Sequence, residues 1–523
     1  MGTQPNQGPD LRTGMKWPGI LGMLATVALL GGGSFWAATT EISGAVIAIG
    51  SVEVTSSTLG DGWCVHRGIA GSGAPPPARR LGPMIRRIDL RSAATGRTPG
   101  EPFDYRTALP RADFDVEAAV PATHAICEEV RTRGLEAILE MSQKFDGVTQ
   151  SDIRVPVEEM TRALEELDPA IRAGLEESVR RLRVASEAEL EQDVVTDLGP
   201  GARVVHRKVP VGRVGLYVPG GLAPLVSSVL MNVVPAQVAG VPSLALASPP
   251  QQEFGGLPHP TILAACALLG VEEVYAVGGA QAIAMFAYGT GPCAKVDLVT
   301  GPGNIWVVTA KRLLKGLVGV DSEAGATEIL IVADASADPR FVAVDLISQA
   351  EHDESAQSLL ITDDAEFGRA VAEAVEKRLE TLERRAIAGA SWRDFGAVIT
   401  VADLDEAAEL SDRIAPEHLE LCVADPEALS GKIRHAGAIF LGQWTPEAIG
   451  DYVGGPNHVL PTARSARFSS GLSVLDFMKR TTLSKMSPDA LRACGPAAEV
   501  LAKSESLEAH GLSVTARLRK LNG

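Results

Sequence analysis

Short apolar runs that end in glycine and lead into helices constrain the fold of this chain more than any other feature. Three such runs span residues 214–218, 273–277 and 296–300, and a glycine turn follows each of them. Further β-like runs follow at 328–333, 358–362, 397–401 and 438–441, and a helical pattern separates several of them. Strands that alternate with helices predict parallel sheets covered on both faces. We therefore expect an α/β protein with two doubly wound parallel-sheet domains, plus smaller helical N-terminal and C-terminal segments.

Length, charge and cysteine content limit the class of protein further. A chain of 523 residues is too long for one core, so several domains are expected. The formal net charge of −17 and the absence of a basic stripe argue against a nucleic-acid partner. The six cysteines are scattered and form no CxxC pair. This pattern is typical of reduced, cytoplasmic proteins and argues against a thiolate-rich zinc site.

The N-terminus differs in composition from the rest of the chain. No charged residue lies between Trp17 and Thr40, and Arg12 and Lys16 precede this apolar stretch. Residues 18–39 are long enough to cross a bilayer, so residues 1–58 are a candidate membrane anchor or extension. A signal peptide is a second interpretation. A third is a fused fragment or misplaced start codon, with Met84 as the natural first residue.

Composition divides the remaining chain into segments. Residues 59–83 are rich in Gly, Pro and Arg and predict a disordered linker. Charged helical patterns over 116–190 predict that residues 84–205 form a helical N-terminal part. We assign residues 206–335 and 336–465 to the two α/β domains, and residues 466–523 to a C-terminal helical segment.

The glycine turns suggest a nucleotide. Glycine lets backbone N–H groups approach a ligand closely, and a helix N-terminus favours negative charge. However, the dinucleotide fingerprint is incomplete, because Trp306 stands where its third glycine would follow Gly301 and Gly303. Each domain is therefore expected to be an incomplete Rossmann-like unit. Any single turn could equally be a tight strand–helix connection.

Four polar residues from distant segments suggest a metal site. Gln349 and His352 are three residues apart in a predicted helix, so one ion could contact both. Asp451 lies in a predicted loop, and His510 lies near the C-terminus. Imidazole and oxygen ligands suit zinc, although manganese or cobalt could occupy the same set. The alternative roles are helix capping for Asp451 and a helix-end position for His510.

The pair Glu417-His418 suggests acid–base chemistry. Histidine is the usual general base near neutral pH, and a neighbouring carboxylate could deprotonate a water molecule. Because Pro416 is a good first helical residue, the pair is expected at a helix start. There the two side chains would point about 100° apart and serve different substrate atoms. The alternative is a solvated helix start.

From Met84 to Gly523 the chain resembles the histidinol dehydrogenase family. The resemblance rests on seven ordered motifs: GLYVPGG (215–221), VGGAQAIA (277–284), TGPGN (300–304), SQAEH (348–352), APEHLE (415–420), GDYVGGPNHVLPT (450–462) and EAHGLSVTARL (508–518). Separately, residues 21–54 resemble the anchor of type I secretion membrane fusion proteins. That second resemblance implies a membrane-anchored adaptor. Such an adaptor would have a long coiled coil after the anchor, and the sequence shows none.

The first resemblance implies a reaction and its residues. Members of the family oxidise L-histidinol to L-histidine with two NAD, through a bound aldehyde, as the last step of histidine biosynthesis. The resemblance implies that His418 takes the alcohol proton and Glu417 activates water. It further implies that Zn2+ is held by Gln349, His352, Asp451 and His510. NAD would contact Tyr217, Gln281 and Asn304. The substrate would contact Thr327 and Glu505, together with His418 and the four zinc ligands.

Two further expectations follow from the resemblance. The family forms homodimers that exchange the C-terminal segment, so Glu505 and His510 are expected to reach the neighbouring subunit. Thr327 replaces a serine that contacts substrate in the family, and the prolines of its loop are missing. A relative that oxidises another amino alcohol or a diol, such as a sulfopropanediol dehydrogenase, therefore stays an alternative.

Overall fold

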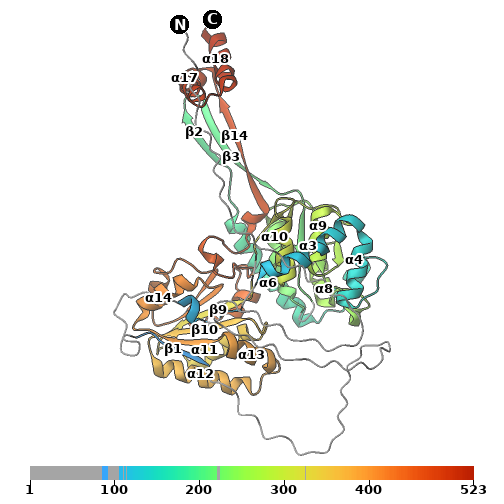
Figure 1. The fold of residues 1–523 in the computed structure, drawn as a ribbon, viewed down its shortest axis with the longest axis vertical. Coiled ribbons are helices and arrows are strands. Elements are labelled where there is room, and N and C mark those ends of the chain that lie inside the picture. The colour runs from blue at the N-terminus through green and yellow to red at the C-terminus, as the bar shows by residue number, and fades with distance from the viewer. Residues whose placement is uncertain are drawn as a thin grey trace, which may run out of the picture. The chain divides into compact units, whose positions relative to one another are not determined.

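The computed structural model describes residues 85–91, 105–109, 111–112, 115–220, 224–323 and 325–522. These residues belong to one compact unit (Figure 1). The candidate membrane anchor at 18–39, the resemblance over 21–54 and the linker at 59–83 lie outside them. Among the described residues, no helix has the length and apolar character needed to cross a membrane.

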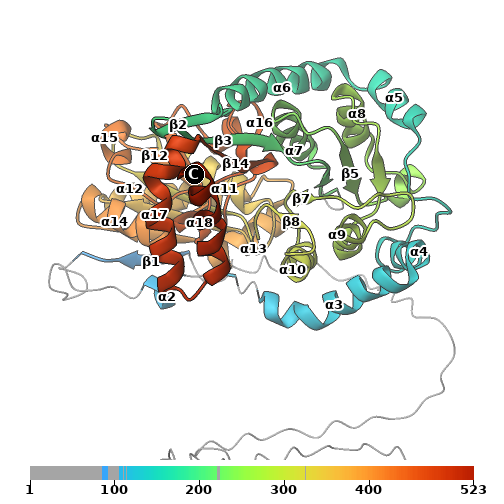
Figure 2. The ribbon, with the colours of Figure 1, turned by 90° about the horizontal axis from the view of Figure 1, so that it is seen from above.

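The first parallel sheet has five strands in the order β6-β5-β4-β7-β8. Its strands alternate side chains between two apolar cores, as in β4, where Leu216 faces one core and Tyr217 the other. Helices α7 and α8 cover one face, and α9 and α10 cover the other (Figure 2). The elements are β4 (Val214–Tyr217), β5 (Leu244–Ser248), β6 (Val274–Ala276), β7 (Leu298–Thr300), β8 (Gly319–Val320), α7 (Val226–Val238), α8 (Pro260–Leu268), α9 (Gly279–Tyr288) and α10 (Ile305–Leu314).

The second parallel sheet has six strands in the order β1-β11-β10-β9-β12-β13. Its β9 and β10 are fully buried, as expected for strands covered on both faces. Helices α11, α12 and α13 pack on one face, and α14 and α15 pack on the other. The elements are β1 (Arg86–Asp89), β9 (Glu328–Ala333), β10 (Gln357–Thr362), β11 (Ala397–Thr400), β12 (His418–Cys422), β13 (Ala438–Leu441), α11 (Pro339–Ala350), α12 (Ala365–Leu379), α13 (Arg385–Phe395), α14 (Leu404–Ile414), α15 (Pro426–Ser430) and α16 (Glu447–Tyr452).

The remaining elements lie at the two ends of the described chain. Helix α3 packs on α9 and α10, α5 packs on α8, and α6 packs on α7. An antiparallel sheet of order β14-β3-β2 leads to the paired helices α17 and α18 (Figure 1). The elements are α2 (Tyr105–Ala108), α3 (Val116–Arg133), α4 (Leu135–Met141), α5 (Val157–Glu165), α6 (Pro169–Glu189), β2 (Val194–Gly199), β3 (Ala202–Pro210), β14 (Met478–Met486), α17 (Pro488–Ser504) and α18 (Glu508–Asn522).

The structure confirms the expected α/β class with two doubly wound parallel sheets, and every predicted strand is present. The predicted division of the chain differs in three places. Strand β9 lies before the expected boundary at 335, yet it pairs with β10 and β12 and so belongs to the second sheet. Strand β1, in the segment expected to be helical, pairs with β11. The C-terminal segment contains the long strand β14, which pairs along β3.

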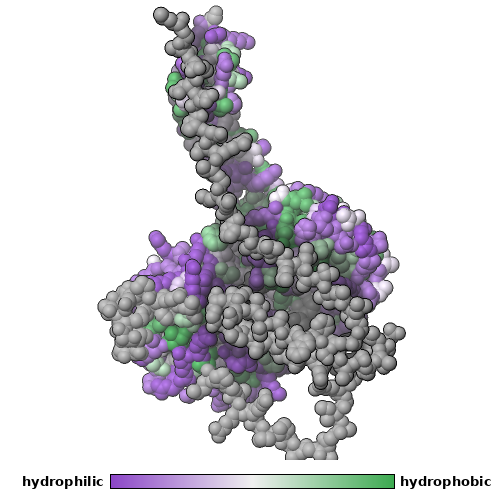
Figure 3. Space-filling view, viewed as in Figure 1, coloured by the Kyte–Doolittle hydropathy of each residue, from purple (hydrophilic) through white to green (hydrophobic). Residues whose placement is uncertain are grey.

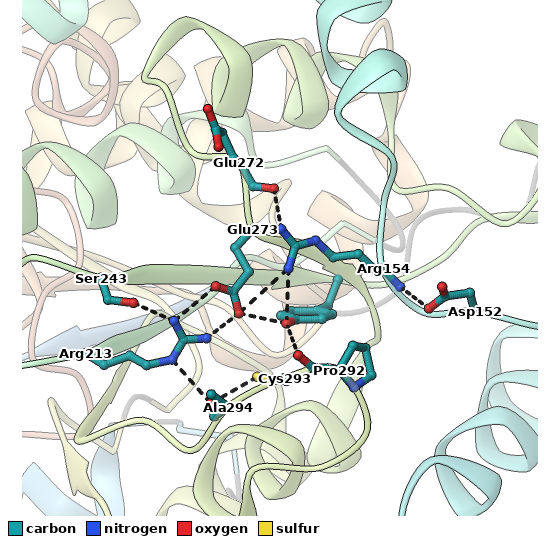
Figure 4. Close-up of polar contacts among 10 residues, drawn as sticks. Asp152, Arg154, Arg213, Ser243, Glu272, Glu273, Pro292, Cys293 and Ala294 are labelled. Carbon is teal, nitrogen blue, oxygen red and sulfur yellow. Dashed lines mark hydrogen bonds and ion pairs between the residues drawn. The ribbon is translucent and has the colours of Figure 1, made fainter.

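A polar network ties the amino ends of three strands of the first sheet (Figure 4). Arg213 precedes β4 and donates a hydrogen bond of 3.0 Å to Glu273, which precedes β6. The same guanidinium donates to Ser243, just before β5. The Tyr275 hydroxyl donates to Glu273 at 2.7 Å. Because this network lies at the amino edge, it stabilises the sheet at the edge opposite the glycine turns.

Candidate active site

Catalytic candidates gather at the amino ends of β9 and β12 in the second sheet. His418 begins β12, and Thr327 immediately precedes β9. The two strands are hydrogen-bonded neighbours, with His418 opposite Ile329. The expected helix start at Glu417-His418 is wrong. Ala415 adopts a left-handed φ of 49° and ends α14, and the next residues enter the buried strand between β9 and β13.

His418 is held as a neutral base with one open nitrogen. Its Nδ1 lies 3.1 Å from the carbonyl oxygen of Glu328. A carbonyl can only accept, so Nδ1 carries the proton and Nε2 has the lone pair. Burial lowers the pKa of His418, which also favours the neutral ring. Nε2 is buried and has no hydrogen-bond partner among the described residues. It can therefore accept a proton from a bound molecule.

Glu417 is a buried carboxyl fixed by two donors. Its Oε2 accepts from the Thr327 hydroxyl at 2.7 Å and from the Glu328 backbone N–H at 2.9 Å. The same oxygen lies 3.7 Å from His418 Nδ1. Burial raises the pKa of Glu417 to about 8. A carboxyl with a pKa near neutrality suits proton transfer to and from water. Thr327 thus keeps the hydroxyl function expected of a serine there.

The raised pKa of Glu417 predicts a pH-dependent stability in the presence of a metal chelator. Unfolding lowers this pKa to its ordinary value near 4.5. The stabilisation that the folded state gains by holding this proton is therefore complete below pH 4.5 and is lost as pH rises through about 8. The loss amounts to at most about 1.4 kcal/mol per pH unit. Thermal unfolding between pH 5 and 8 should show a shallower decline for Glu417→Gln than for the wild type. Parallel declines would contradict the assigned pKa.

Three potential metal ligands form a cluster beside His418. One ligand atom each from His352, Glu447 and Asp451 lies within 4.8 Å of the others. His352 lies two residues beyond the end of α11, not inside the predicted helix, while Asp451 lies in α16, not in a loop. Burial raises the pKa values of Glu447 and Asp451. A divalent cation would offset the cost of charging them, so this donor set fits zinc or a similar ion.

Gln349 joins the cluster of potential metal ligands to the carboxyl group of Glu417. Its buried side-chain amide contacts the Thr327 hydroxyl at one end and the Glu447 carboxylate at the other. A carboxylate can only accept a hydrogen bond, so the amide nitrogen of Gln349 faces Glu447. The amide oxygen lies next to the Thr327 hydroxyl and 3.0 Å from the Glu328 backbone nitrogen. Thr327 therefore contacts both Gln349 and Glu417. The four residues form one continuous polar cluster.

Sequence reasoning missed Glu447. Its Oε1 lies 3.6 Å from His418 Nδ1, and its backbone N–H donates to Glu420 at 2.7 Å. Glu447 and Asp451 are four residues apart in α16, so they share one helix face. This spacing was the available signal. It was overlooked because the segment after β13 was expected to be a loop.

The residues predicted to contact a nucleotide lie at the carboxyl ends of strands of the first sheet. Tyr217 ends β4 and is buried, and its hydroxyl accepts a 3.1 Å hydrogen bond from Gly279 N–H. Gln281 lies in the first turn of α9 and is buried. The Asn304 oxygen caps α10 by accepting from Trp306 and Val307 N–H. The Tyr217 and Asn304 side chains thus each hold the start of a helix that follows a glycine turn.

One segment of the chain connects the two α/β domains. The Asn457 side chain donates to Met231 O in α7 at 2.7 Å, and His458 Nε2 lies 3.0 Å from Ser227 Oγ of the same helix. Thr462 further along accepts from Gly325 N–H, two residues before Thr327. Burial lowers the pKa of His458 to about 4. The segment therefore links the Thr327 loop to the first domain through neutral contacts.

Two predicted site residues lie elsewhere. Glu505 ends α17 and His510 lies in the first turn of α18, and both are exposed. The ligand cluster found among the described residues does not include His510. A single chain therefore brings together Gln349, His352 and Asp451 but leaves His510 outside the cluster.

Comparisons with known proteins point to one family. The histidinol dehydrogenase family model matches residues 109–518. The histidinol dehydrogenase of Ruegeria pomeroyi is 62% identical over 411 residues, covering 78% of this chain and 94% of the relative. That of Cereibacter sphaeroides is 57% identical over 431 residues, covering 82% and 98%. Nothing in these comparisons supports the expected secretion-adaptor segment.

A solved structure shows the same architecture. The crystal structure of histidinol dehydrogenase from Elizabethkingia anophelis superposes with a TM-score of 0.79 at 32% identity, covering 84% of this chain and 99% of that one. The family model spans the first sheet, strands β9 to β13 of the second sheet, His418 and the candidate ligands. The chain therefore belongs to the histidinol dehydrogenase family.

Proposed function

We propose that this protein oxidises L-histidinol to L-histidine with two NAD, through L-histidinal that stays bound. The observation that carries the proposal is the open Nε2 of His418, next to the buried carboxyl of Glu417 and the cluster of potential metal ligands. An alcohol-to-acid oxidation needs a base at the hydroxyl and a second group that activates water. The test is the formation of about two NADH per L-histidinol by the purified protein. A folded protein that forms none would contradict the proposal.

The proposed cofactors are one zinc ion per subunit and NAD. The zinc would be held by Gln349, His352 and Asp451 of one chain and by His510. It would supply an anchor for the imidazole and amine of the substrate. NAD supplies a hydride acceptor when it is bound at the glycine turns. Tyr217, Gln281 and Asn304 would shape and contact that nucleotide site. Manganese or cobalt would suit the same oxygen and nitrogen donors.

The protein residues would move protons in two stages. In the first, His418 Nε2 takes the proton of the substrate hydroxyl while a hydride passes from the carbon that bears this hydroxyl to NAD, which gives the aldehyde. In the second, Glu417 takes a proton from a water molecule as the oxygen of that water adds to the aldehyde carbon. A second hydride then leaves the hydrated carbon and gives the acid. Because both side chains are buried, few other water molecules would compete for the aldehyde.

The proposed setting is the cytoplasm, as a step of histidine biosynthesis. The five cysteines described by the structure are all free, and four of them are buried. Such cysteine usage is typical of a reducing compartment. The net charge of −17 disfavours association with nucleic acid.

We further propose a homodimer in which the C-terminal segment of one chain completes the site of the other. Helix α18 has no buried residue, and the α17–α18 pair exposes Val500, Leu501 and Leu512. Figure 3 shows scattered hydrophobic residues among hydrophilic ones on this end of the molecule. Exposed apolar side chains of this size favour burial against another surface. In such a dimer Glu505 would contact the substrate, and His510 would join Gln349, His352 and Asp451 of the other chain as a zinc ligand.

Subunit mixing tests this arrangement. His418→Asn and His510→Ala homodimers are each expected to be inactive. In a mixed dimer with exchanged segments, one site carries both lesions and the other carries none. Random mixing should therefore restore about one quarter of wild-type activity. If His510 serves its own chain, every site of the mixed dimer carries one lesion, and mixing after partial unfolding and refolding would restore nothing.

A further inference from the structure

A buried lysine and aspartate hold the glycine turn that follows β7. Lys311 lies in α10 and Asp321 follows β8, and their Nζ and Oδ1 atoms are 2.6 Å apart. Their side chains are only 3% and 4% exposed. A pair enclosed to this degree is not positioned to touch a ligand, so its contacts must explain its presence.

Both charged groups form hydrogen bonds with the backbone of Gly301. Asp321 Oδ2 accepts from the Gly301 N–H at 2.8 Å, and Lys311 Nζ donates to the Gly301 carbonyl. Gly301 itself has a φ of +112°, and a Cβ there would lie 2.0 Å from the Tyr217 carbonyl oxygen. The pair therefore fixes a backbone conformation that only glycine adopts readily, pressed against the end of β4.

The turn held in this way leads directly to Asn304 and the start of α10. The Asn304 side chain caps that helix, three residues after Gly301. A shift of the Gly301 peptide would move the cap and the first helical N–H groups together. Burying an ion pair costs desolvation free energy, and apolar replacements are often equally stable. Stability alone is therefore a poor reason for this pair.

We infer that Lys311 and Asp321 are positioning residues that preform the Gly301–Asn304 turn for NAD. This inference rests on the proposed use of NAD at that turn. A preformed turn lowers the ordering cost of binding, so the pair acts on nucleotide affinity and not on proton transfer. The base His418 and the carboxyl Glu417 lie in the other sheet, and their contacts do not include the pair.

The test uses the full-length protein with Lys311→Met combined with Asp321→Leu, which removes the pair without leaving one buried charge. The KM for NAD and the calorimetric Kd for NAD alone should rise about ten- to hundredfold. The kcat at saturating NAD should stay within about threefold. Asp321→Asn combined with Lys311→Met, which keeps an oxygen acceptor for the Gly301 N–H, should give a smaller rise in KM than Asp321→Leu combined with Lys311→Met.

A matched control replaces a partly buried ion pair at the opposite edge of the same sheet. Arg213→Met with Glu273→Leu alters the amino edge and should leave the KM for NAD within about twofold, whatever its thermal midpoint. An equal rise in KM for this control, or an unchanged KM in the Lys311 and Asp321 variants, would overturn the inference. Wild-type protein that binds NAD but does not oxidise L-histidinol would refute only the proposed substrate. Wild-type protein that does not bind NAD would overturn the positioning role as well.

Discussion

His418→Asn is expected to lower kcat with L-histidinol by about 10²- to 10⁴-fold. Asparagine can still donate to the Glu328 carbonyl, as Nδ1 does now, but it has no basic nitrogen in place of Nε2. The hydroxyl proton would then have no acceptor in this buried site. Steady-state NADH formation measures the loss, and calorimetry should show L-histidinol affinity within about threefold of wild type. A kcat within tenfold of wild type would mean that another group is the base.

Glu417→Gln is expected to stop the reaction after its first half. The glutamine oxygen can still accept from Thr327 and Glu328 N–H, so the local structure is kept, but an amide cannot take a proton from water. Oxidation of L-histidinal should fall by about 10²- to 10⁴-fold. A single turnover with L-histidinol should still produce a burst of about one NADH per subunit.

The two variants act as controls for each other. Glu417→Gln should impair the aldehyde reaction more than the alcohol reaction, and His418→Asn should impair the alcohol reaction. Stopped-flow measurements with each substrate separate the two half-reactions. If Glu417→Gln still converts L-histidinol fully to L-histidine at the wild-type rate, the water is activated by another group.

The sequence was most informative where periodicity was strong. Buried strands such as β9 and β10 contain short apolar runs, and glycine turns mark the ends of β4, β6 and β7. The local error at Glu417-His418 has a clear cause. Pro416 suits a helix start, but the strands on either side of β12 supply hydrogen bonds that only an extended chain can use. Tertiary pairing thus outweighed local preference.

The candidate site was predictable in residue type but not in geometry. The motifs contain Gln349, His352 and Asp451, and the structure brings all three to Glu447, with Asp451 next to His418. Glu447 was missed because its helix was expected to be a loop. The roles of Tyr217 and Asn304 in shaping turns depend on contacts between distant segments, which one sequence does not display. His510 lies outside the cluster of potential ligands in the described chain, so its predicted role rests on the proposed dimer.

The most direct test of the account is NADH stoichiometry with and without metal. Purified protein should form about two NADH per L-histidinol, lose this activity after chelation and regain it when zinc is added. That result would join the base, the water-activating carboxyl and the ligand cluster in one reaction. About one NADH per L-histidinol, or full activity in a chelated protein verified to be free of metal, would contradict it.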